Sequence, residues 1–329
     1  MTNIRLYDYQ IEMKERIEAA FRSCRSVMVQ MPTGTGKTHV LASVVTDEVQ
    51  MAKNACVWIV AHRRELVEQI EASLVCQSGL ACSEFQSSFI KVMSIQWLSK
   101  HYGELDEKPS LIVIDEAHHA LARTYAEVMN AYPEAKKLGV TATPCRLNLK
   151  GFSDLFDVLL QSCSTKKFIA DGRLSLYDYM SIKADSEDQR MVFGLTKRGT
   201  DGDFSLKEMS EKLDVRPSIE RLCNTVLRYA SGKKGITYAI DVNHAEHIAE
   251  YYREHGIPAV AISWKTSADE RKRIVEEFKR SGGSDEKGEV SSGAVRVLVN
   301  VDLFGEGFDC PDVEFIQLAR PTLSLAKYL

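Results

Sequence analysis

The sequence predicts an α/β protein with two parallel β-sheets in tandem. In the first half, short and continuously apolar runs alternate with segments of helical periodicity, and a second alternation of the same kind follows a polar stretch at 181–204. Apolar strands separated by helices are typical of parallel sheets covered on both faces. A chain of 329 residues is long enough for two such domains. We expect domains over 1–178 and 211–329, with a connection or insertion over 179–210.

The composition indicates a globular protein and excludes several other classes. Hydrophobic residues make up 44% of the chain and charged residues 27%, which is enough apolar material for true cores. The formal net charge of −4 gives no overall attraction to nucleic acid, so such a partner would need a local basic surface. The eight cysteines form no CxxC pair, which argues against a zinc site and a disulfide framework. We expect a cytoplasmic protein without a membrane partner, because no signal-type or membrane-spanning apolar run occurs.

Each expected strand is a short apolar run followed by a turn or helix signal. In the first domain these runs are 27–31, 56–60, 90–95, 111–114 and 138–141. Helical spacing of apolar residues predicts helices over 11–21, 40–49 and 64–74. In the second domain the same signals predict strands at 235–240, 259–263, 295–299 and 313–318, and helices at 245–255 and 268–280. The Gly- and Ser-rich segment 281–293 is expected to be a mobile loop.

Residues 31–38, Met-Pro-Thr-Gly-Thr-Gly-Lys-Thr, lie between an expected strand and an expected helix, which is the context of a phosphate-binding loop. Backbone N–H groups of such a loop turn toward an anion at the positive end of the helix. Here they belong to Thr33, Gly34, Thr35 and Gly36. Lys37 would reach the β- and γ-phosphates of a nucleotide, and Thr38 would offer its hydroxyl to Mg²⁺. Met31 stands where the general motif has its first glycine, so a plain glycine turn before a helix is the alternative.

Two adjacent carboxylates, Asp115 and Glu116, follow the apolar run 111–114. Ligands of open parallel sheets bind at the carboxyl ends of the strands, where this pair would lie. Phosphoryl transfer needs charge neutralisation and an aligned nucleophile. Asp115 would therefore hold Mg²⁺, partly through water, and Glu116 would orient and deprotonate the attacking water. Alone, the pair could equally be the acidic cap of a following helix; the loop at 31–38 favours the catalytic interpretation.

Six short motifs occur in the order found in superfamily 2 helicases. They are Tyr9-Gln10, the loop at 31–38, Ala-His-Arg-Arg-Glu-Leu at 61–66, Asp-Glu-Ala-His at 115–118, Thr-Ala-Thr-Pro at 141–144 and Gly-Glu-Gly-Phe-Asp at 305–309. Over nearly its whole length the sequence resembles DEAD/DEAH-box helicases of this superfamily, above all the bacterial and phage relatives of XPB-like (Rad25-like) DNA-repair helicases. The resemblance implies two RecA-like domains of the P-loop NTPase class, ATP and Mg²⁺ as cofactors, and a nucleic-acid partner, DNA rather than RNA.

The resemblance also implies roles around the nucleotide. Gln10 would read the adenine edge, with Tyr7 or Arg5 stacking on the base, although an exposed helix residue is the alternative for Gln10. From the second domain, Gly307 and Asp309 would close on the ribose and γ-phosphate region, where a glycine-rich turn is the alternative.

Further matching positions concern the nucleic acid. His118 would link the nucleotide site to Thr141 and Thr143, whose hydroxyls would pass the nucleotide state toward the bound strand. The expected contacts to nucleic acid are Arg63, Arg64, Ser94, Gln96 and Asn300. For Arg64, a solvated charge at a helix start is the alternative.

Two departures from the family pattern qualify these expectations. Val301 replaces the threonine expected before Asp302, which shifts any contact there to Asn300 or to the backbone. The family also carries an arginine-rich Gln-x-x-Gly-Arg-x-x-Arg motif soon afterwards, and this sequence ends at Leu329 before it. An arginine finger contributes several orders of magnitude to rate in related nucleotide hydrolases. We therefore expect a truncated chain that binds ATP and Mg²⁺ but hydrolyses ATP poorly.

The function expected from these motifs is that of an ATP-dependent helicase or translocase, which couples ATP hydrolysis to movement along a nucleic-acid strand. Its grip would fall mainly on phosphates, so sequence preference would be weak and affinity would decrease with salt. Three alternatives remain: a double-stranded DNA translocase that does not separate strands, a nucleotide-switched binding module without turnover, and a small-molecule P-loop kinase. The kinase is disfavoured because the motifs at 115–118 and 141–143 have no role in it.

Overall fold

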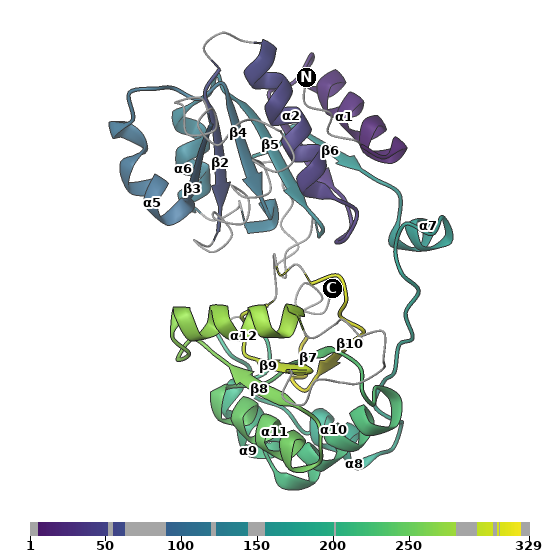
Figure 1. Cartoon of the computed structure of the whole chain (residues 1–329). Helices are drawn as coiled ribbons and strands as arrows, with labels where there is room; N and C mark the ends of the chain where they lie inside the picture. The colour runs from purple at the N-terminus through teal and green to yellow at the C-terminus, as the bar shows by residue number, and fades with distance from the viewer. Residues whose placement is uncertain are drawn as a thin grey trace. The chain divides into compact units, whose positions relative to one another are not determined.

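The computed structural model describes the residues 6–51, 55–62, 90–119, 123–143, 155–200, 202–280, 295–304, 308 and 310–323. The chain divides into two compact units, Met1–Asp178 and Tyr179–Tyr328 (Figure 1). Each unit has a parallel sheet and apolar clusters of its own. The predicted α/β class with two tandem parallel sheets is confirmed.

Within the described residues, unit 1 has a six-stranded sheet of order β3-β2-β4-β5-β1-β6, in which every neighbouring pair is parallel. The strands are β1 (Ser26–Gln30), β2 (Val57–Ala61), β3 (Ile90–Ser94), β4 (Leu111–Asp115), β5 (Lys136–Thr141) and β6 (Val158–Gln161). The first five correspond to the predicted apolar runs. The sixth was not predicted, because it is a four-residue edge strand with only alternate residues half-buried.

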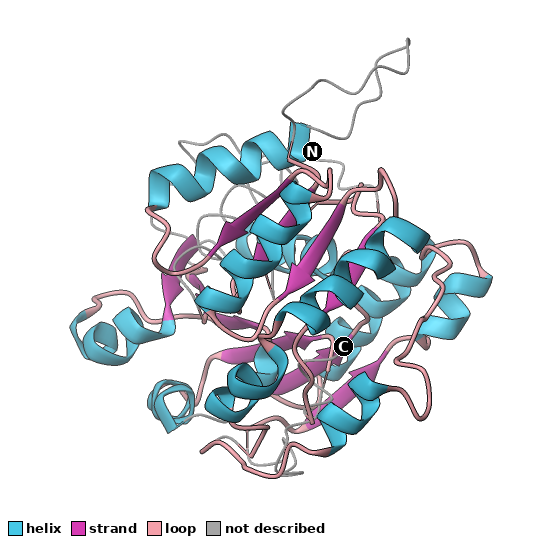
Figure 2. Cartoon of the chain, turned by 90° about the horizontal axis from the view of Figure 1, so that it is seen from below, coloured by secondary structure: helices cyan, strands magenta, loops and turns pink. Residues whose placement is uncertain are grey.

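Helices cover both faces of the unit 1 sheet (Figures 1 and 2). They are α1 (Asp8–Ala20), α2 (Lys37–Met51), α5 (Ile95–His101) and α6 (Arg123–Ala131). Unit 1 also contains helix α7 (Thr165–Ala170), which lies away from the sheet (Figure 1), and the 3₁₀ turns η1 (Tyr102–Glu104) and η2 (Ala117–His119). Helices α1 and α2 share an apolar cluster with one face of the sheet, and α5 and α6 share a second cluster with the other face. The predicted helix 64–74 lies outside the described residues.

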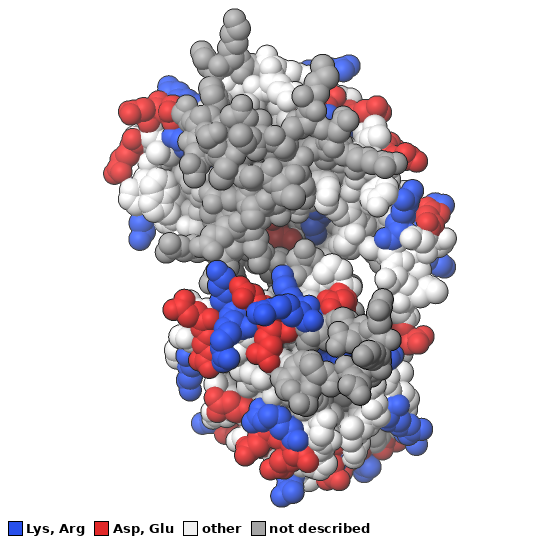
Figure 3. Space-filling view, viewed as in Figure 1, with Lys and Arg blue, Asp and Glu red and all other residues white. Residues whose placement is uncertain are grey.

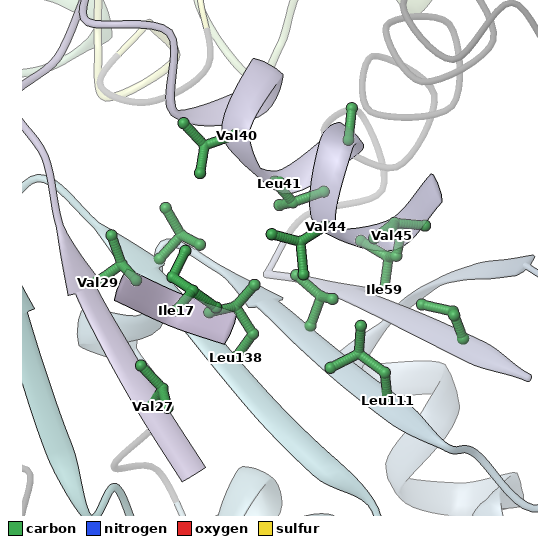
Figure 4. Packing of buried hydrophobic residues seen from close by; sticks show 14 of the residues in the cluster. Ile17, Val27, Val29, Val40, Leu41, Val44, Val45, Ile59, Leu111 and Leu138 are labelled. Carbon is green, nitrogen blue, oxygen red and sulfur yellow. The ribbon is translucent and has the colours of Figure 1, made fainter. Parts of the chain in front are cut away.

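The packing of α2 fixes the position of the loop that precedes it. Val40, Leu41, Val44 and Val45 form one stripe of this helix and point onto the sheet, where strands β1, β2, β4 and β5 supply the facing side chains (Figure 4). Each fully buried side chain of this kind contributes on the order of 1.5–3 kcal/mol. Because Lys37 is the first residue of α2, this core holds the start of the helix firmly against the end of β1.

Unit 2 has a four-stranded parallel sheet of order β10-β7-β9-β8 within the described residues. Its strands are β7 (Gly235–Tyr238), β8 (Ala259–Ile262), β9 (Val297–Asn300) and β10 (Phe315–Leu318). Its helices are α8 (Glu187–Phe193), α9 (Leu206–Leu213), α10 (Arg216–Tyr229), α11 (Val242–Glu254) and α12 (Ala268–Arg280). Helices α10 and α11 pack on one face of the sheet and α12 on the other. The segment 281–293 lies outside the described residues.

The polar stretch 179–210 is more regular than a simple connection. It contains α8 and the start of α9, and its side chains Leu195, Phe204 and Met209 form an apolar cluster with Ile240. The carboxylate of Glu208 anchors the preceding turn by accepting hydrogen bonds from the backbone N–H groups of residues 196 and 197 at 3.0 and 2.8 Å. In the structure this stretch therefore belongs to unit 2. None of the helices in the described parts of the chain is both long and apolar enough to cross a membrane.

Candidate active site

Three neighbouring strands bring the predicted site residues to one edge of the unit 1 sheet. In the sheet order, β5 lies between β4 and β1. The loop at 31–38 follows β1, Asp115 ends β4, and Thr141 ends β5. Because the strands are parallel, all three carboxyl ends meet at the same edge. The loop is joined to β5 directly, since the backbone N–H of Met31 donates to the carbonyl oxygen of Thr141 at 3.0 Å.

The loop at 31–38 is wound by two glycines in the left-handed region, Gly34 with φ +80° and Gly36 with φ +75°. Between them Thr35 is buried and turns back on the loop: its hydroxyl donates to the carbonyl oxygen of Pro32 at 2.7 Å. Thr33 is exposed at the rim. Lys37 and Thr38 lie in the first turn of α2, where backbone N–H groups have no carbonyl partner within the helix. Such a concave loop at a helix start fits a phosphate group.

A substitution at Gly36 tests this geometry. In Gly36→Ala the new Cβ would overlap the amide of Gln10, and alanine would also be forced into the left-handed region. We expect a loss of about 1–3 kcal/mol in the free energy of unfolding, together with weaker nucleotide binding. Gly172→Ala is the matched control, because Gly172 has φ +67° but open space around its Cα. Urea unfolding of the two variants separates the steric cost from the backbone cost; equal losses would contradict the expected overlap.

Gln10 and Tyr9 of α1 anchor the loop at 31–38 through hydrogen bonds. The Nε2 of Gln10 donates to the carbonyl oxygen of Thr35 at 3.0 Å, and the hydroxyl of Tyr9 donates to the same oxygen at 3.1 Å. Burial raises the pKa of Tyr9, which keeps this hydroxyl a donor. Gln10 is only 2% exposed, and its Oε1 accepts the backbone N–H of Tyr7 at 2.9 Å. Gln10 is thus an internal anchor of the loop rather than an exposed helix residue; its contact with adenine stays a prediction.

Residues 173 and 174, which the sequence did not single out, pack beside Tyr7, Tyr9 and the loop at 31–38. The guanidinium of Arg173 lies over the rings of Tyr7 and Tyr9, at 4.8 and 5.9 Å from their centroids. The two rings are themselves stacked with centroids 5.8 Å apart. The next residue, Leu174, places its side chain beside Gly34. No motif or spacing connects position 173 with the loop, because the contact depends on how the chain returns after α7.

Glu116 lies between a lysine and a histidine. Its Oε1 is 3.7 Å from the Nζ of Lys37, and its Oε2 is 3.3 Å from the Nδ1 of His118. The side chains of Lys37 and Glu116 are only 12% and 15% exposed, so water screens their attraction less than on an open surface. Glu116 also has φ +48°, a left-handed conformation that is unfavourable for a residue with a Cβ. Its backbone N–H donates to Asp115 Oδ1 at 3.0 Å. Such strain is characteristic of functional positions.

His118 connects this carboxylate to the end of β5. Its Nδ1 lies 3.1 Å from the hydroxyl oxygen of Thr141 as well as near Glu116. The Thr141 hydroxyl in turn accepts the backbone N–H of Thr143 at 3.1 Å. A continuous polar chain therefore runs from Lys37 through Glu116 and His118 to the 141–143 turn. This arrangement brings together the residues proposed for phosphate binding, water activation and coupling.

The residues present fit Mg²⁺ and a nucleoside triphosphate. The hydroxyl of Thr38 and the carboxylate of Asp115 are hard oxygen donors at this sheet edge, and Mg²⁺ in phosphate sites binds one or two such groups plus phosphate oxygens and water. Among the residues described, no group of three or more His, Cys, Asp or Glu side chains is placed to hold a metal by itself.

The residues predicted to contact nucleic acid lie in different settings in the structure. Ser94 caps α5 by accepting the N–H of Trp97 at 3.3 Å, and the exposed Gln96 donates to the carbonyl oxygen of His62 at 2.7 Å. Asn300 is fully buried: its Oδ1 accepts the N–H groups of residues 303 and 304 at 3.2 and 3.4 Å. Its side chain stabilises a turn in unit 2, and its contact with nucleic acid stays a prediction. Further predicted residues lie outside the described part: Arg63, Arg64, Gly307 and Asp309.

Two family models match the chain, one in each unit. The model described as "Type III restriction enzyme, res subunit" matches residues 3–146, and the model described as "Helicase conserved C-terminal domain" matches residues 217–329. Among solved structures, the chain is similar to the Hef helicase domain of Pyrococcus furiosus, with a TM-score of 0.56 and 16% identity, covering 94% of this chain and 89% of that one. This likeness concerns the fold, which has the same tandem arrangement of RecA-like domains.

Curated relatives extend across both units. A 51.5 kDa protein of a Lactococcus phage (isolate 7-9) is 30% identical over 92% of this chain and 60% of its own length. The Saccharomyces cerevisiae protein IRC3 is 25% identical over 97% of this chain and 47% of its own length. The DNA 3'-5' translocase XPB2 of Sulfurisphaera tokodaii is 25% identical over 94% of this chain and 73% of its own length. This chain thus spans about half of the length of the first two relatives. The restriction-enzyme res-subunit model in unit 1, the helicase C-terminal model in unit 2 and the motifs brought to one sheet edge together support a superfamily 2 helicase that is related to the XPB-like proteins.

Proposed function

We propose that this chain is the ATP-hydrolysing motor core of a nucleic-acid helicase or translocase that acts on DNA. The observation that carries the proposal is the meeting of Lys37 and Glu116, 3.7 Å apart, beside a phosphate-binding loop at the carboxyl edge of the sheet. A cation for the phosphates and a carboxylate for the attacking water are the two groups that phosphoryl transfer to water needs.

The chemistry follows from the residues at this edge. The backbone N–H groups of the loop would bind the phosphate oxygens of ATP, and the Lys37 ammonium would offset part of their negative charge. Lys37 is the one lysine or arginine among residues 31–38. Bound Mg²⁺, held by Thr38 and Asp115, would withdraw charge from the phosphate oxygens. Glu116 would accept a proton from the water that attacks the γ-phosphate. Its contacts with His118 and Lys37 would keep the carboxylate oriented.

A change in the bound nucleotide would be transmitted to the nucleic acid through the polar chain that runs from Lys37 through Glu116 and His118 to the 141–143 turn. When the γ-phosphate leaves, the Lys37 ammonium would be released to Glu116, its partner at 3.7 Å, and His118 would follow Glu116. Movement of His118 would alter its contact with Thr141, and so the turn that holds Thr143. In this proposal the second domain, over 211–329, contributes Gly307 and Asp309 to the nucleotide, and Arg63, Arg64, Ser94 and Gln96 contact the strand.

DNA is the proposed partner because a relative that aligns with 94% of this chain is named a DNA translocase. The word translocase in that name is also compatible with the second candidate, a motor that moves along duplex DNA without separating its strands. The scattered cysteines favour a reducing compartment, so we place the protein in the cytoplasm.

A comparison of nucleic acids tests the proposal. ATP hydrolysis by this chain should increase with DNA and increase less with RNA of equal length. Strand displacement on a forked duplex together with ATP would favour the helicase, whereas displacement of a triplex-forming strand without unwinding would favour the duplex translocase. Hydrolysis that responds to none of these nucleic acids, with no binding to any of them, would overturn the proposed function.

A further inference from the structure

A rigid turn at the carboxyl end of β8 presents two exposed side chains from unit 2. The N–H of Thr266 donates to the carbonyl oxygen of Ser263 at 3.0 Å, and the N–H of Ser263 donates to the Thr266 hydroxyl at 3.1 Å. The N–H of Lys265 donates to the Ser263 hydroxyl at 3.2 Å. Arg271 of α12 adds a bond from its Nη2 to the carbonyl oxygen of Thr266 at 3.2 Å. These bonds fix Trp264 and Lys265 at the corner of the turn.

Trp264 is unusual for its exposure. Its side chain is 71% exposed, whereas Trp58 is fully buried. The ammonium of Lys265 lies 5.9 Å from the centre of the Trp264 ring. A large exposed aromatic ring with a cation over one face, held on a preformed turn, is a combination that can stack an unpaired base next to its phosphate.

The position of the turn supports a ligand there. Ligands of open parallel sheets bind at the carboxyl ends of the strands, and Trp264 comes two residues after β8 ends. Lysine and arginine side chains gather over the adjoining helix α12, with acidic side chains between them (Figure 3). Lys272 and Arg273 are exposed in its second turn.

The cavity beside the turn helps to decide what binds. It has a volume of about 230 Å³, and its lining includes Lys265 and Thr266 but also Glu246 and Glu270. Two carboxylates in the wall disfavour a phosphate inside the cavity. The phosphates would instead pass along the outer side of Lys265, and the face of Trp264 turned away from Lys265 would take the base.

We propose that Trp264 stacks on an unpaired base of a bound single strand, with Lys265 meeting the adjoining phosphate. This inference rests on the proposed nucleic-acid function and adds a base contact to a grip otherwise expected to fall on phosphates. Stacking on a tryptophan is tolerant of sequence, because every base has a π-face.

Binding of oligo-dT and of an abasic strand with the same number of phosphates tests the inference. Trp264→Ala should weaken binding to oligo-dT by roughly 5- to 100-fold, and Trp264→Phe should retain most of the affinity. On the abasic strand the wild-type protein and Trp264→Ala should bind alike. Lys265→Ala should instead lower the dependence of log K on log salt by about 0.7, the share of one phosphate contact on a single strand.

Fluorescence gives an independent readout. With Trp97→Phe as background, Trp264 is the exposed tryptophan that remains, and oligo-dT should quench its emission. The outcomes separate the two proposals. If the wild-type protein binds oligo-dT but Trp264→Ala binds it equally well, or loses as much affinity for the abasic strand, the stacking inference is overturned alone. If the wild-type protein binds no nucleic acid, the proposed function fails and the inference with it.

Discussion

Lys37→Ala is expected to weaken the binding of ATP by about 10- to 100-fold, because a hydrogen-bonded charge contact contributes on the order of 1.5–3 kcal/mol. Lys37 is the cation at the phosphate-binding loop, and its removal leaves Glu116 without its neutralising partner. The unpaired carboxylate would then repel the triphosphate as well. Titration with a fluorescent ATP analogue in the presence of Mg²⁺ measures the effect.

A second lysine of the same sheet provides the control. Lys91 of β3 pairs with Glu107 on the surface, away from the carboxyl edge, so Lys91→Ala removes a charge and an ion pair without touching the loop. It should bind ATP like the wild-type protein. Equal affinities for Lys37→Ala and Lys91→Ala would contradict the assignment of Lys37 to the phosphates.

Glu116→Gln should reduce the rate of ATP hydrolysis by about 10²- to 10⁴-fold and leave ATP binding intact, the effect expected when a general base is removed. The amide keeps the size and the hydrogen-bonding reach of the side chain but cannot take a proton from water. It also removes a negative charge that lies 3.7 Å from Lys37, so the lysine is released to the phosphates and binding should hold or tighten. Single-turnover hydrolysis and analogue titration measure the two effects separately.

Glu107→Gln is the matched control for this change, because it neutralises a carboxylate that also pairs with a lysine but lies on the surface. Its hydrolysis rate should equal that of the wild-type protein. A Glu116→Gln protein that hydrolyses ATP at the wild-type rate would show that another group activates the water.

The strands that carry the site could be predicted from the sequence because their signal is local. The run at 111–114 is continuously apolar, and in the structure alternate residues of β4 enter the clusters on opposite faces of the sheet. A run buried on both sides, followed at once by two carboxylates, fixes both the strand and the edge at which Asp115 and Glu116 lie. The same holds for the loop, since its glycines adopt the left-handed conformations that only glycine adopts easily.

The missed features depend on tertiary contacts or on weaker signals. Arg173 reaches Tyr7 and Tyr9 from a position more than 160 residues along the chain, and no local pattern carries that information. For Asn300 the local signal is ambiguous. A polar residue at the end of a strand suggests a contact with a ligand, whereas in the structure its buried side-chain oxygen accepts two backbone N–H groups of the following turn. Helix α10 was missed although a signal existed, because Ile219, Cys223 and Val226 have helical spacing.

A crystal structure of the Glu116→Gln variant with ATP and Mg²⁺ tests the central claim most directly. The account predicts a triphosphate enclosed by residues 33–38, with the Lys37 ammonium on the β- and γ-phosphate oxygens, Mg²⁺ near Thr38 and Asp115, and the side chain at position 116 facing the γ-phosphate. A nucleotide bound elsewhere, or bound at this loop with its γ-phosphate turned away from position 116, would contradict it.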